Sequence, residues 1–405
     1  MKKHYIILVG LLLSFIVPSV IVAGEAEEDT VNTVSFHSEF ETKLQLKEVP
    51  DPAPRFVYDT GYEFEYPDAV RGIYLTGHSA GNFRFENLIE YVNETELNSM
   101  VIDIKDDHGN ITYEFPEDSP FHEASQNFIG DPKEMMDRLE EEGIYPIARV
   151  VVFKDSELAH KKPEWSFKDN GEVWENNKGE AFVNPFVKDV WEYNVEIAKE
   201  AAELGFKEIQ FDYVRFPEGF EKNDERLDYT RGDYDDASLD NIRERVNAVT
   251  DFVEYANNEL EVYDIDVSVD IFGYTATIGD APGIGQNFLR IANNVDVISS
   301  MIYPSHWTTG YFGIQNPDTE PYRLIDEYIQ EESELLEQLD DGPISRPWIQ
   351  DFTASWLYSP GQSFTYGPKQ VQDQIDALYD NGVYEYLLWD AGNTYTEGVD
   401  YDPQN

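Results

Sequence analysis

The chain of 405 residues has no cysteine, and its basic residues are few. The missing cysteines exclude disulfide bonds, thiolate nucleophiles and cysteine-based zinc sites. Only 29 Lys and Arg stand against 81 Asp and Glu, which gives a formal net charge of −52. A charge of this sign and size argues against nucleic acids and anionic membranes as partners, because both are polyanions.

Long hydrophobic runs are also missing, apart from one at the N-terminus. The apolar run from Tyr5 to Val22 follows two lysines, is interrupted by Pro18 and is followed by small residues. This pattern predicts a signal peptide over residues 1–23, with an uncleaved N-terminal anchor as the alternative. The remainder is therefore expected to be secreted or extracytoplasmic, possessing no other membrane contact.

Composition divides the rest of the chain into two parts. Residues 24–55 are rich in Glu, Thr and Ser, have no firm periodicity and end in Asp51-Pro-Ala-Pro54, so we interpret them as a flexible leader. With 41% hydrophobic and 14% aromatic residues, the chain can bury a large core. No internal repeat or second linker is evident, and residues 56–405 are expected to form one domain.

Short apolar runs alternate with amphipathic segments throughout this domain. Eight runs are predicted as strands: 70–75, 99–104, 145–152, 208–211, 266–271, 296–303, 346–352 and 384–389. Seven segments are predicted as helices: 82–94, 132–142, 187–204, 239–260, 284–293, 321–339 and 368–380. Alternation of eight strands with helices predicts an α/β fold, a (β/α)8 TIM barrel with enlarged βα loops. An open doubly wound sheet is less compatible, because Gly77-His-Ser-Ala-Gly81 lacks the spacing of a dinucleotide-binding turn.

The stretch from Gly205 to Pro217, GFKEIQFDYVRFP, is the centre of this pattern. A helix is expected to end at Gly205, and the following apolar run stops at Asp212. A carboxylate where a buried strand ends costs free energy unless it is hydrogen-bonded or used. Active sites of barrel enzymes lie at this end of the strands, so Asp212 is the first catalytic candidate. The alternative is a structural aspartate paired with Arg215.

Polar or aromatic side chains also lie at the ends of all the remaining predicted strands. Asp270, from the strand after that of Asp212, is the second catalytic candidate. The residues expected to bind substrate are Asp103, Lys105, Asp106, Arg149, Arg215, Tyr303, His306, Trp307, Gln350, Asp351, Trp389 and Asp390. Aromatic faces combined with hydrogen-bonding groups suit sugars, whose CH faces stack while their hydroxyls need partners.

Two carboxylates on either side of a glycosidic bond are sufficient for its hydrolysis. We expect Arg215 or another cation to keep Asp212 ionised, and burial together with the charge of Asp212 to raise the pKa of Asp270. The sequence alone does not assign the proton donor or the stereochemical outcome.

Several of these residues have other interpretations. Asp103, Lys105 and Asp106 could form a self-contained ion-pair cluster. A Schiff base on Lys105 is disfavoured by its acidic neighbours. Asp106 and His108 could begin a metal site, but no spacing supplies further ligands, so neither a metal nor another cofactor is expected. The segment 153–185, with its tryptophans and glycines, is interpreted as an ordered flap over the cleft.

With these motifs in view, the chain resembles the bacterial putative glycoside hydrolase domain family, a TIM-barrel group formerly described as a domain of unknown function. The resemblance covers about residues 70–396. It is carried by VRGIYL (70–75), VIDIKD (101–106), YPIAR (145–149), IQFDYVRFP (209–217), DIFGY (270–274), MIYPS (301–305) and WIQDF (348–352). It implies a barrel with a glycosidase site, in which Asp212 matches a strand-four nucleophile. Where related barrels carry Glu on strand five, this chain has Asp270.

We therefore expect an exported O-glycoside hydrolase that cleaves a cell-surface or extracellular polysaccharide with two carboxylates. A non-catalytic carbohydrate-binding envelope protein on a barrel scaffold and a metal-dependent polysaccharide deacetylase are the alternatives. The sugar, the linkage and the oligomeric state are left open by the sequence.

The acidic residues are scattered along the whole chain, which is typical of a surface adapted to a saline environment. The free energy of unfolding should therefore rise as NaCl is added to a dilute buffer, because salt screens the repulsion between carboxylates. Urea unfolding followed by circular dichroism at low and molar NaCl measures this. Equal stability in both solutions would contradict the prediction.

Overall fold

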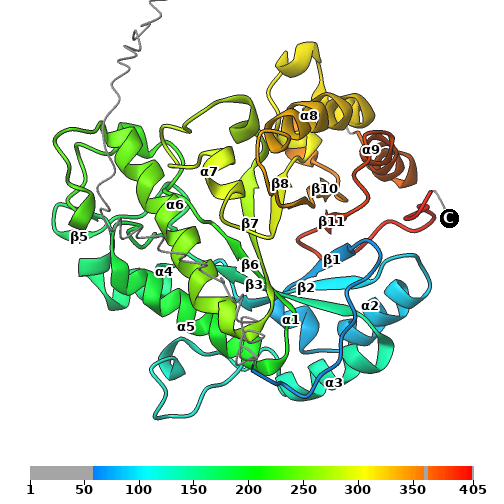
Figure 1. Cartoon of the computed structure of the whole chain (residues 1–405), viewed down its shortest axis with the longest axis horizontal. Helices are drawn as coiled ribbons and strands as arrows, with labels where there is room; N and C mark the ends of the chain where they lie inside the picture. The colour runs from blue at the N-terminus through cyan, green and yellow to red at the C-terminus, as the bar shows by residue number, and fades with distance from the viewer. Residues whose placement is uncertain (1–57, 360–363, 404–405) are drawn as a thin grey trace, which may run out of the picture. The chain divides into compact units, whose positions relative to one another are not determined.

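Eight parallel strands close into a barrel in the computed structural model, which describes residues 58–359 and 364–403 (Figure 1). The barrel strands are β1 (Arg71–Leu75), β2 (Ser99–Lys105), β3 (Tyr145–Val151), β6 (Glu208–Asp212), β7 (Asp266–Phe272), β8 (Val297–Met301), β10 (Trp348–Gln350) and β11 (Tyr386–Trp389). Each strand pairs with the next one in this order, and β11 pairs with β1. A pair between Met301 of β8 and Trp348 of β10 closes the ring. The predicted fold class is confirmed.

The seventh position of the barrel is shared by two short strands. β9 (Ile344–Ser345) pairs with the first half of β8, and β10 pairs with its end. Pro347 lies between them and has no N–H to donate, so the ladder is interrupted there. Of the predicted strand 346–352, only residues 348–350 form a strand, β10, and β9 lies just before the predicted range.

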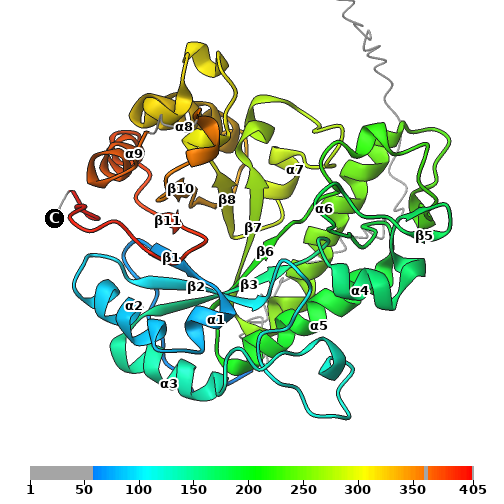
Figure 2. The same ribbon diagram turned by 180° about the vertical axis from the view of Figure 1, so that it is seen from behind.

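Helices surround the barrel and cover the outer face of its strands (Figure 2). The longer ones are α2 (Arg84–Asn93), α3 (Pro132–Glu142), α5 (Lys188–Leu204), α6 (Asn241–Leu260), α8 (Pro321–Leu336) and α9 (Pro368–Asp380), and the shorter ones are α1 (Gly77–Ala80), α4 (Ser156–Lys161) and α7 (Phe288–Ala292). The seven predicted helices are all present, whereas α1 and α4 were not predicted.

Local sequence explains where several helices begin and end. Asp131 caps α3 by accepting hydrogen bonds from the N–H groups of Lys133 and Glu134, and Gly143 ends the helix in the left-handed region at φ 67°. The helix predicted over 284–293 begins four residues later, at Phe288. Asn287 supplies the cap there, because its side chain accepts from the N–H of Arg290.

Alternation along β6 shows how the barrel interior is built. Ile209 and Phe211 point outward into the apolar layer between strands and helices. Glu208, Gln210 and Asp212 point inward and are all nearly inaccessible. Gln210 donates to Ser299 across the barrel at 3.2 Å. The interior of the barrel therefore contains layers of polar side chains, one near each end of the strands and one between these two.

The layer at the N-terminal end of the strands is centred on Arg346. Its guanidinium lies 2.6 Å from Glu208 and 2.8 Å from Glu385, and it donates to the hydroxyl of Tyr66 at 2.8 Å. Glu208 also accepts from Ser268 at 2.6 Å. A buried charge with this many partners is compensated, and this end of a barrel ordinarily serves stability.

The segment after β3 is the largest insertion into the barrel. It contains α4 and a small hairpin of β4 (Lys168–Asp169) and β5 (Glu172–Val173). Its two ends are joined by a backbone hydrogen bond, since the N–H of Val183 donates to the carbonyl of Phe153 at 2.9 Å. The prediction of an ordered flap over 153–185 agrees with this structure.

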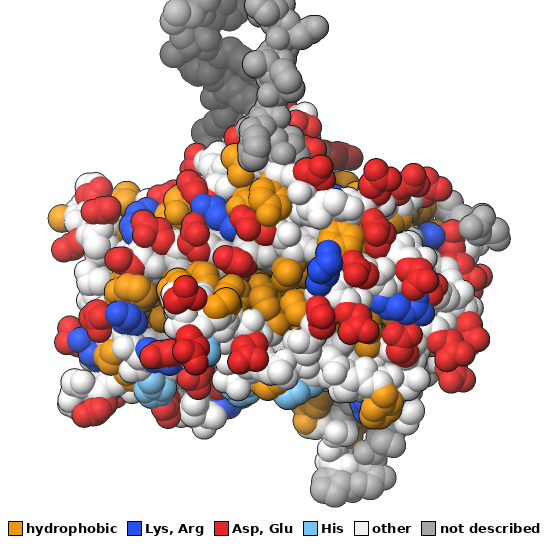
Figure 3. All heavy atoms as spheres, turned by 90° about the horizontal axis from the view of Figure 1, so that it is seen from below, with side chains coloured by type: hydrophobic (Ala, Val, Ile, Leu, Met, Phe, Trp, Pro, Cys, Tyr) orange, Lys and Arg blue, Asp and Glu red, His pale blue; other side chains and the backbone are white. Residues whose placement is uncertain are grey.

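The predicted signal peptide or anchor (1–23) and the predicted leader (24–55) lie outside the described residues. The described residues of the predicted domain 56–405 belong to one barrel with its helices and loops. Among the described residues, no helix has both the length and the apolar character to cross a membrane. Acidic side chains are spread over the face shown in Figure 3, with fewer lysines and arginines among them.

Replacing Arg346 by leucine should lower the free energy of unfolding by about 3–5 kcal/mol, because Glu208 would be buried without its cation. Urea unfolding of the intact chain measures the change. Arg323→Leu is the matched control. That arginine is 47% exposed and makes only loose ion pairs on α8, so its loss should cost less than about 1 kcal/mol. Equal effects of the two substitutions would contradict the assignment.

Candidate active site

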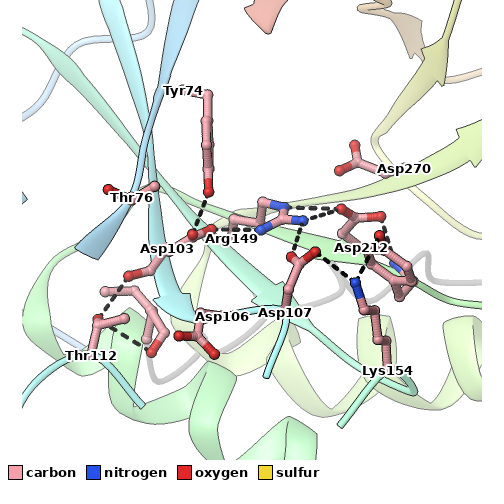
Figure 4. A network of polar contacts seen from close by, with 12 residues as sticks. Tyr74, Thr76, Asp103, Asp106, Asp107, Thr112, Arg149, Lys154, Asp212 and Asp270 are labelled. Carbon is pink, nitrogen blue, oxygen red and sulfur yellow. Dashed lines mark hydrogen bonds and ion pairs between the residues drawn. The ribbon is translucent and has the colours of Figure 1, made fainter. Parts of the chain in front are cut away.

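The polar layer at the C-terminal end of the strands is centred on Arg149, an inward residue of β3 that is 1% exposed. Its guanidinium donates to Asp103 of β2 at 2.6 Å, to Asp107 at 2.9 Å and to Asp212 of β6 at 2.9 and 2.5 Å. Figure 4 shows the three carboxylates converging on it. A planar guanidinium with five N–H donors is suited to hold several carboxylates in fixed positions.

Asp212 is the last residue of β6, and both of its oxygens accept hydrogen bonds. Oδ2 accepts from Arg149, and Oδ1 accepts from the backbone N–H of Tyr213 at 2.5 Å. Tyr213 has φ 51°, a left-handed conformation that is uncommon for a bulky residue and that turns the chain sharply at the strand end. Such outliers occur most often where function needs a fixed geometry. The surroundings of Asp212 are those of a carboxylate anion.

Asp270 lies on the neighbouring strand β7, in the same row as Asp212. The pairing of Phe211 with Val269 sets this register. Its Oδ1 accepts from the indole N–H of Trp348 at 2.8 Å, and no cation pairs with it among the described residues. Burial and the charge of Asp212 raise the pKa of Asp270 well above its usual value, as the sequence predicted. The two aspartates therefore differ in their surroundings: Asp212 is bound by the guanidinium of Arg149, whereas Asp270 has no cation beside it among the described residues and a raised pKa.

A cleft of about 240 Å³ opens above this pair. Its walls include Tyr303, Trp389 and Trp348, and Trp389 stacks on Tyr74 with ring centroids 4.2 Å apart. His306, Phe272 and Met301 lie along one side. A cavity with aromatic walls and charged groups at its base is the usual design of a small-molecule or sugar site.

Asp103 binds the terminal nitrogen of Arg149 that Asp212 does not contact, whereas Asp107 shares the other terminal nitrogen with Asp212. Burial raises the pKa of Asp103 to about 7, although Arg149 acts in the other direction, and Asp103 accepts a hydrogen bond from Tyr74 at 2.5 Å. Burial alone would also raise the pKa of Asp107, but Arg149 and Lys154 together hold it well below its usual range. Arg149 thus contacts two carboxyl groups whose pKa values are shifted in opposite directions: that of Asp103 is raised and that of Asp107 is lowered.

Most of the sequence-predicted site residues gather at this end of the barrel. Those that line the cleft are Asp212, Asp270, Arg149, Arg215, Tyr303, His306 and Trp389. Asp103 lies beside it, bound to Arg149. Trp307 lines a second cavity that adjoins the cleft. No test of catalysis or binding is contained in this geometry, so their roles stay predictions.

Lys105 was expected in the cleft, but the structure corrects this. Its ammonium is fully buried outside the barrel, 2.7 Å from Asp155 and 3.0 Å from Asn194 of α5. A shift of register between Asp103 and Lys105 inserts one extra residue into β2. This bulge reverses the direction of the side chain, so that Lys105 and Asp103 point to opposite faces.

Gln350, Asp351 and Asp390 are likewise placed away from the cleft. Gln350 is buried in hydrogen bonds with Ser305, Asp318 and the carbonyl of Phe352. Asp351 accepts from the backbone N–H and the hydroxyl of Thr396, which fixes the C-terminal loop. Asp390 accepts from the N–H of Gly392 and shapes a turn.

Asp106 was singled out from its acidic neighbours, but Asp107 is the residue that reaches Arg149. Asp106 instead accepts from the N–H groups of His108 and Asn110 at 2.9 Å each, which closes a tight loop. In the part of the chain that the structure describes, no group of three or more His, Asp or Glu side chains could hold a metal ion. The deacetylase alternative therefore gains no support from this loop.

Arg215, the partner proposed for Asp212, is engaged elsewhere. Its guanidinium lies 3.4 Å from Glu218 and stands over the rings of Tyr213 and Phe272 at 4.6 and 4.7 Å. Arg149 takes its place on Asp212. Arg215 follows the turn at Tyr213, whereas Arg149 lies inside the barrel on the strand next to β6.

Sequence reasoning missed several residues of the site, among them Tyr74, Asp107, Lys154 and Trp348. For two of these residues, the sequence pattern indicated a position facing the site. Tyr74 is an inward position of β1, and Trp348 opens the motif WIQDF on β10. Nothing in the sequence distinguishes Lys154, which reaches Asp107 at 3.1 Å and Glu180 of the flap at 3.0 Å. The flap also contributes Lys178 to the cleft wall.

A family model described as "putative glycosyl hydrolase domain" matches residues 72–395. The sequence has no match among curated proteins. Among solved structures, the glycoside hydrolase domain of PgaB (BpsB) from Bordetella bronchiseptica is similar at 11% identity, with 80% of this chain and 94% of that chain covered and a TM-score of 0.53. This likeness shows a common fold.

Two further structures are similar with TM-scores below 0.5. A hypothetical protein from Ruminiclostridium thermocellum ATCC 27405 is 33% identical over 49% of this chain and 96% of its own, with a TM-score of 0.42. The glycoside hydrolase domain of PelA from Pseudomonas aeruginosa is 10% identical over 83% of this chain and 99% of its own, with a TM-score of 0.45.

Asp103 should make stability depend on pH. Its pKa is about 7 in the folded protein against 3.8 ordinarily, so the folded state keeps a proton that the unfolded state releases between these values. Its contribution to the free energy of unfolding is therefore lost as pH rises from about 4 to about 7.

Urea unfolding at pH 5 and pH 7 in molar NaCl should show a smaller pH-dependent loss for Asp103→Asn than for the wild type. Asp341→Asn, at an exposed residue beyond α8, should keep the wild-type difference. Identical pH dependence in the wild type and Asp103→Asn would contradict this role.

Proposed function

Because the chain belongs to the putative glycosyl hydrolase domain family, we propose that it hydrolyses O-glycosidic bonds, with Asp212 as nucleophile and Asp270 as proton donor. One observation carries this proposal. Two aspartates lie in one row on neighbouring strands: Asp212 is bound by the buried cation Arg149, whereas Asp270 has no cation beside it among the described residues and burial raises its pKa. Glycoside hydrolysis needs this division, since one carboxyl group must be ionised while the other donates a proton.

The spacing of the strands favours a retaining mechanism. Neighbouring strands lie about 4.8 Å apart, and paired residues of parallel strands point to the same side. Two carboxylates in this relation match the separation of about 5–5.5 Å in retaining enzymes better than the roughly 6.5–9.5 Å that inverting enzymes need to admit water.

In the first step, an oxygen of Asp212 attacks the anomeric carbon while the bond to the leaving oxygen breaks. Asp270 gives its proton to that oxygen, so the leaving sugar departs as an alcohol. In the second step, Asp270 removes a proton from water as the water oxygen attacks the same carbon. The bond to Asp212 breaks, and both aspartates return to their starting states.

Arg149 supports both steps by fixing Asp212. Its two donors hold one oxygen of the carboxylate in place at the base of the cleft. Trp348 holds one oxygen of Asp270 and leaves the other without a hydrogen bond among the described residues. That free oxygen is the one suited to carry the proton.

The proposed substrate is a cell-surface or extracellular polysaccharide. The support for this location is the apolar run at residues 5–22, which predicts export. The aromatic walls of the cleft support a sugar as ligand.

Asp212→Asn should remove hydrolysis, and Asp270→Asn should reduce kcat by about 10²–10⁴-fold. Release of reducing ends is measured over a panel of polysaccharides and nitrophenyl glycosides in molar NaCl. The nitrophenyl substrates should depend less on Asp270, because their leaving group needs little protonation. Asp266→Asn is the matched control, since Asp266 lies at the opposite end of the same strand. Hydrolysis that survives Asp212→Asn would overturn the assignment, and glycan binding without any turnover would favour a carbohydrate-binding protein.

The first sugar product should retain the anomeric configuration of the substrate. Proton NMR of the reaction in its first minutes distinguishes the two anomers before they interconvert. A mechanism-based fluorosugar should add one sugar mass to the peptide that contains Asp212. An inverted product would exclude the covalent step while leaving two-carboxylate hydrolysis in place.

A further inference from the structure

A second cavity, of about 570 Å³, adjoins the cleft, and we call it the side cavity. The cleft and the side cavity share four residues in their walls: Glu218, Phe272, Met301 and His306. The two cavities therefore lie side by side, close enough for neighbouring units of one ligand. None of the steps proposed for Asp212 and Asp270 uses the side cavity.

Aromatic rings held in fixed positions dominate its surface. Phe272 stacks on Tyr274 with centroids 5.6 Å apart, and Trp307 meets Tyr311 edge-on at 4.6 Å. The hydroxyl of Tyr311 is hydrogen-bonded to Thr277. Such rings offer rigid apolar faces at little entropic cost, and these are the surfaces on which the CH faces of sugars pack.

Gly273 allows Trp307 to reach this position. A Cβ atom at residue 273 would lie 3.0 Å from Cζ2 of Trp307 and 2.9 Å from the carbonyl oxygen of Met301. Any larger side chain would push the indole away or move the strand end. The sequence GY at 273–274 therefore brings the backbone close beneath the tryptophan while Tyr274 adds a ring beside it.

The charges around the side cavity have one sign. Glu218 and Glu221 lie in its wall, and both are exposed. No lysine or arginine belongs to its wall among the described residues. The guanidinium of Arg215, which lines the adjoining cleft, is stacked on the ring of Phe272 and directed at Glu218. A carboxylated or sulfated sugar would meet like charges there and no partner.

We propose that the side cavity binds the sugar residue next to the one held between Asp212 and Asp270, and that this sugar carries no negative charge. The proposal rests on the glycosidase function proposed above. It makes the substrate a chain of at least two linked sugars, drawn from uncharged rather than anionic polysaccharides. Trp307 provides the stacking face, and Glu218 and Glu221 reject anionic units.

Affinity electrophoresis of the intact chain in native gels tests this without requiring catalysis. The gels contain dextran, galactomannan, arabinoxylan or glycol chitin as uncharged polymers, or polygalacturonate as the anionic one. We expect retardation in at least one uncharged gel and none in polygalacturonate. Absence of retardation in every uncharged gel, or binding of polygalacturonate by the wild type, would overturn the proposal.

Variants then assign the binding to the side cavity. Trp307→Ala should raise the Kd for the retained polymer about tenfold, and Trp307→Phe should raise it less, because a ring remains. Phe83→Ala is the control, since Phe83 is 78% exposed at the start of α2 and lines neither cavity. Unchanged retardation of Trp307→Ala would place the sugar elsewhere and refute the proposal.

A separate double variant tests the role of the negative charge, and its substitutions lie at exposed residues outside the core. Glu218→Gln combined with Glu221→Gln should permit retardation in polygalacturonate while leaving that in the uncharged gel. Continued exclusion of polygalacturonate would refute the role of the two glutamates. Should binding follow these expectations while wild type and Asp212→Asn both release no reducing ends, the side cavity stands and the hydrolase function fails.

Discussion

The site depends on one buried guanidinium. Arg149 is almost fully removed from water, so its charge must be met inside the protein, and three carboxylates meet it within 2.9 Å. These carboxylates come from different segments of the chain. Their common partner therefore fixes the ends of β2, β3 and β6 relative to one another and sets the electrostatic field that Asp270 experiences from the next strand.

A second buried arginine, Arg346, performs a similar task at the other end of the barrel, but with a different outcome. Its carboxylates, Glu208 and Glu385, are enclosed beneath the strands. Around Arg149, by contrast, a cleft with aromatic walls stands open. The same kind of ion-pair layer is thus closed at one end of the barrel and lies beside an open cleft at the other, the end at which barrel enzymes carry their active sites.

Much of the architecture could be predicted because it depends on local patterns. The apolar run that stops at Asp212 identified β6, and Gly205 marked the end of the helix before it. Consecutive strands of such a barrel are neighbours, so Asp212 and Asp270 were expected side by side, and the register of β6 and β7 agrees. Local patterns did not reveal the bulge in β2, because an inserted residue leaves no mark in the periodicity.

Hydrophobic period and chain order were enough to predict the barrel, the order of its strands and the neighbouring positions of the two aspartates. Tertiary structure alone decided that Arg149 rather than Arg215 holds Asp212, that Asp107 rather than Asp106 reaches the network, and that Lys105 faces outward. A bulge or a tight loop at the end of a strand changes the direction in which the following side chains point. Their backbone geometry is set by packing against other parts of the chain.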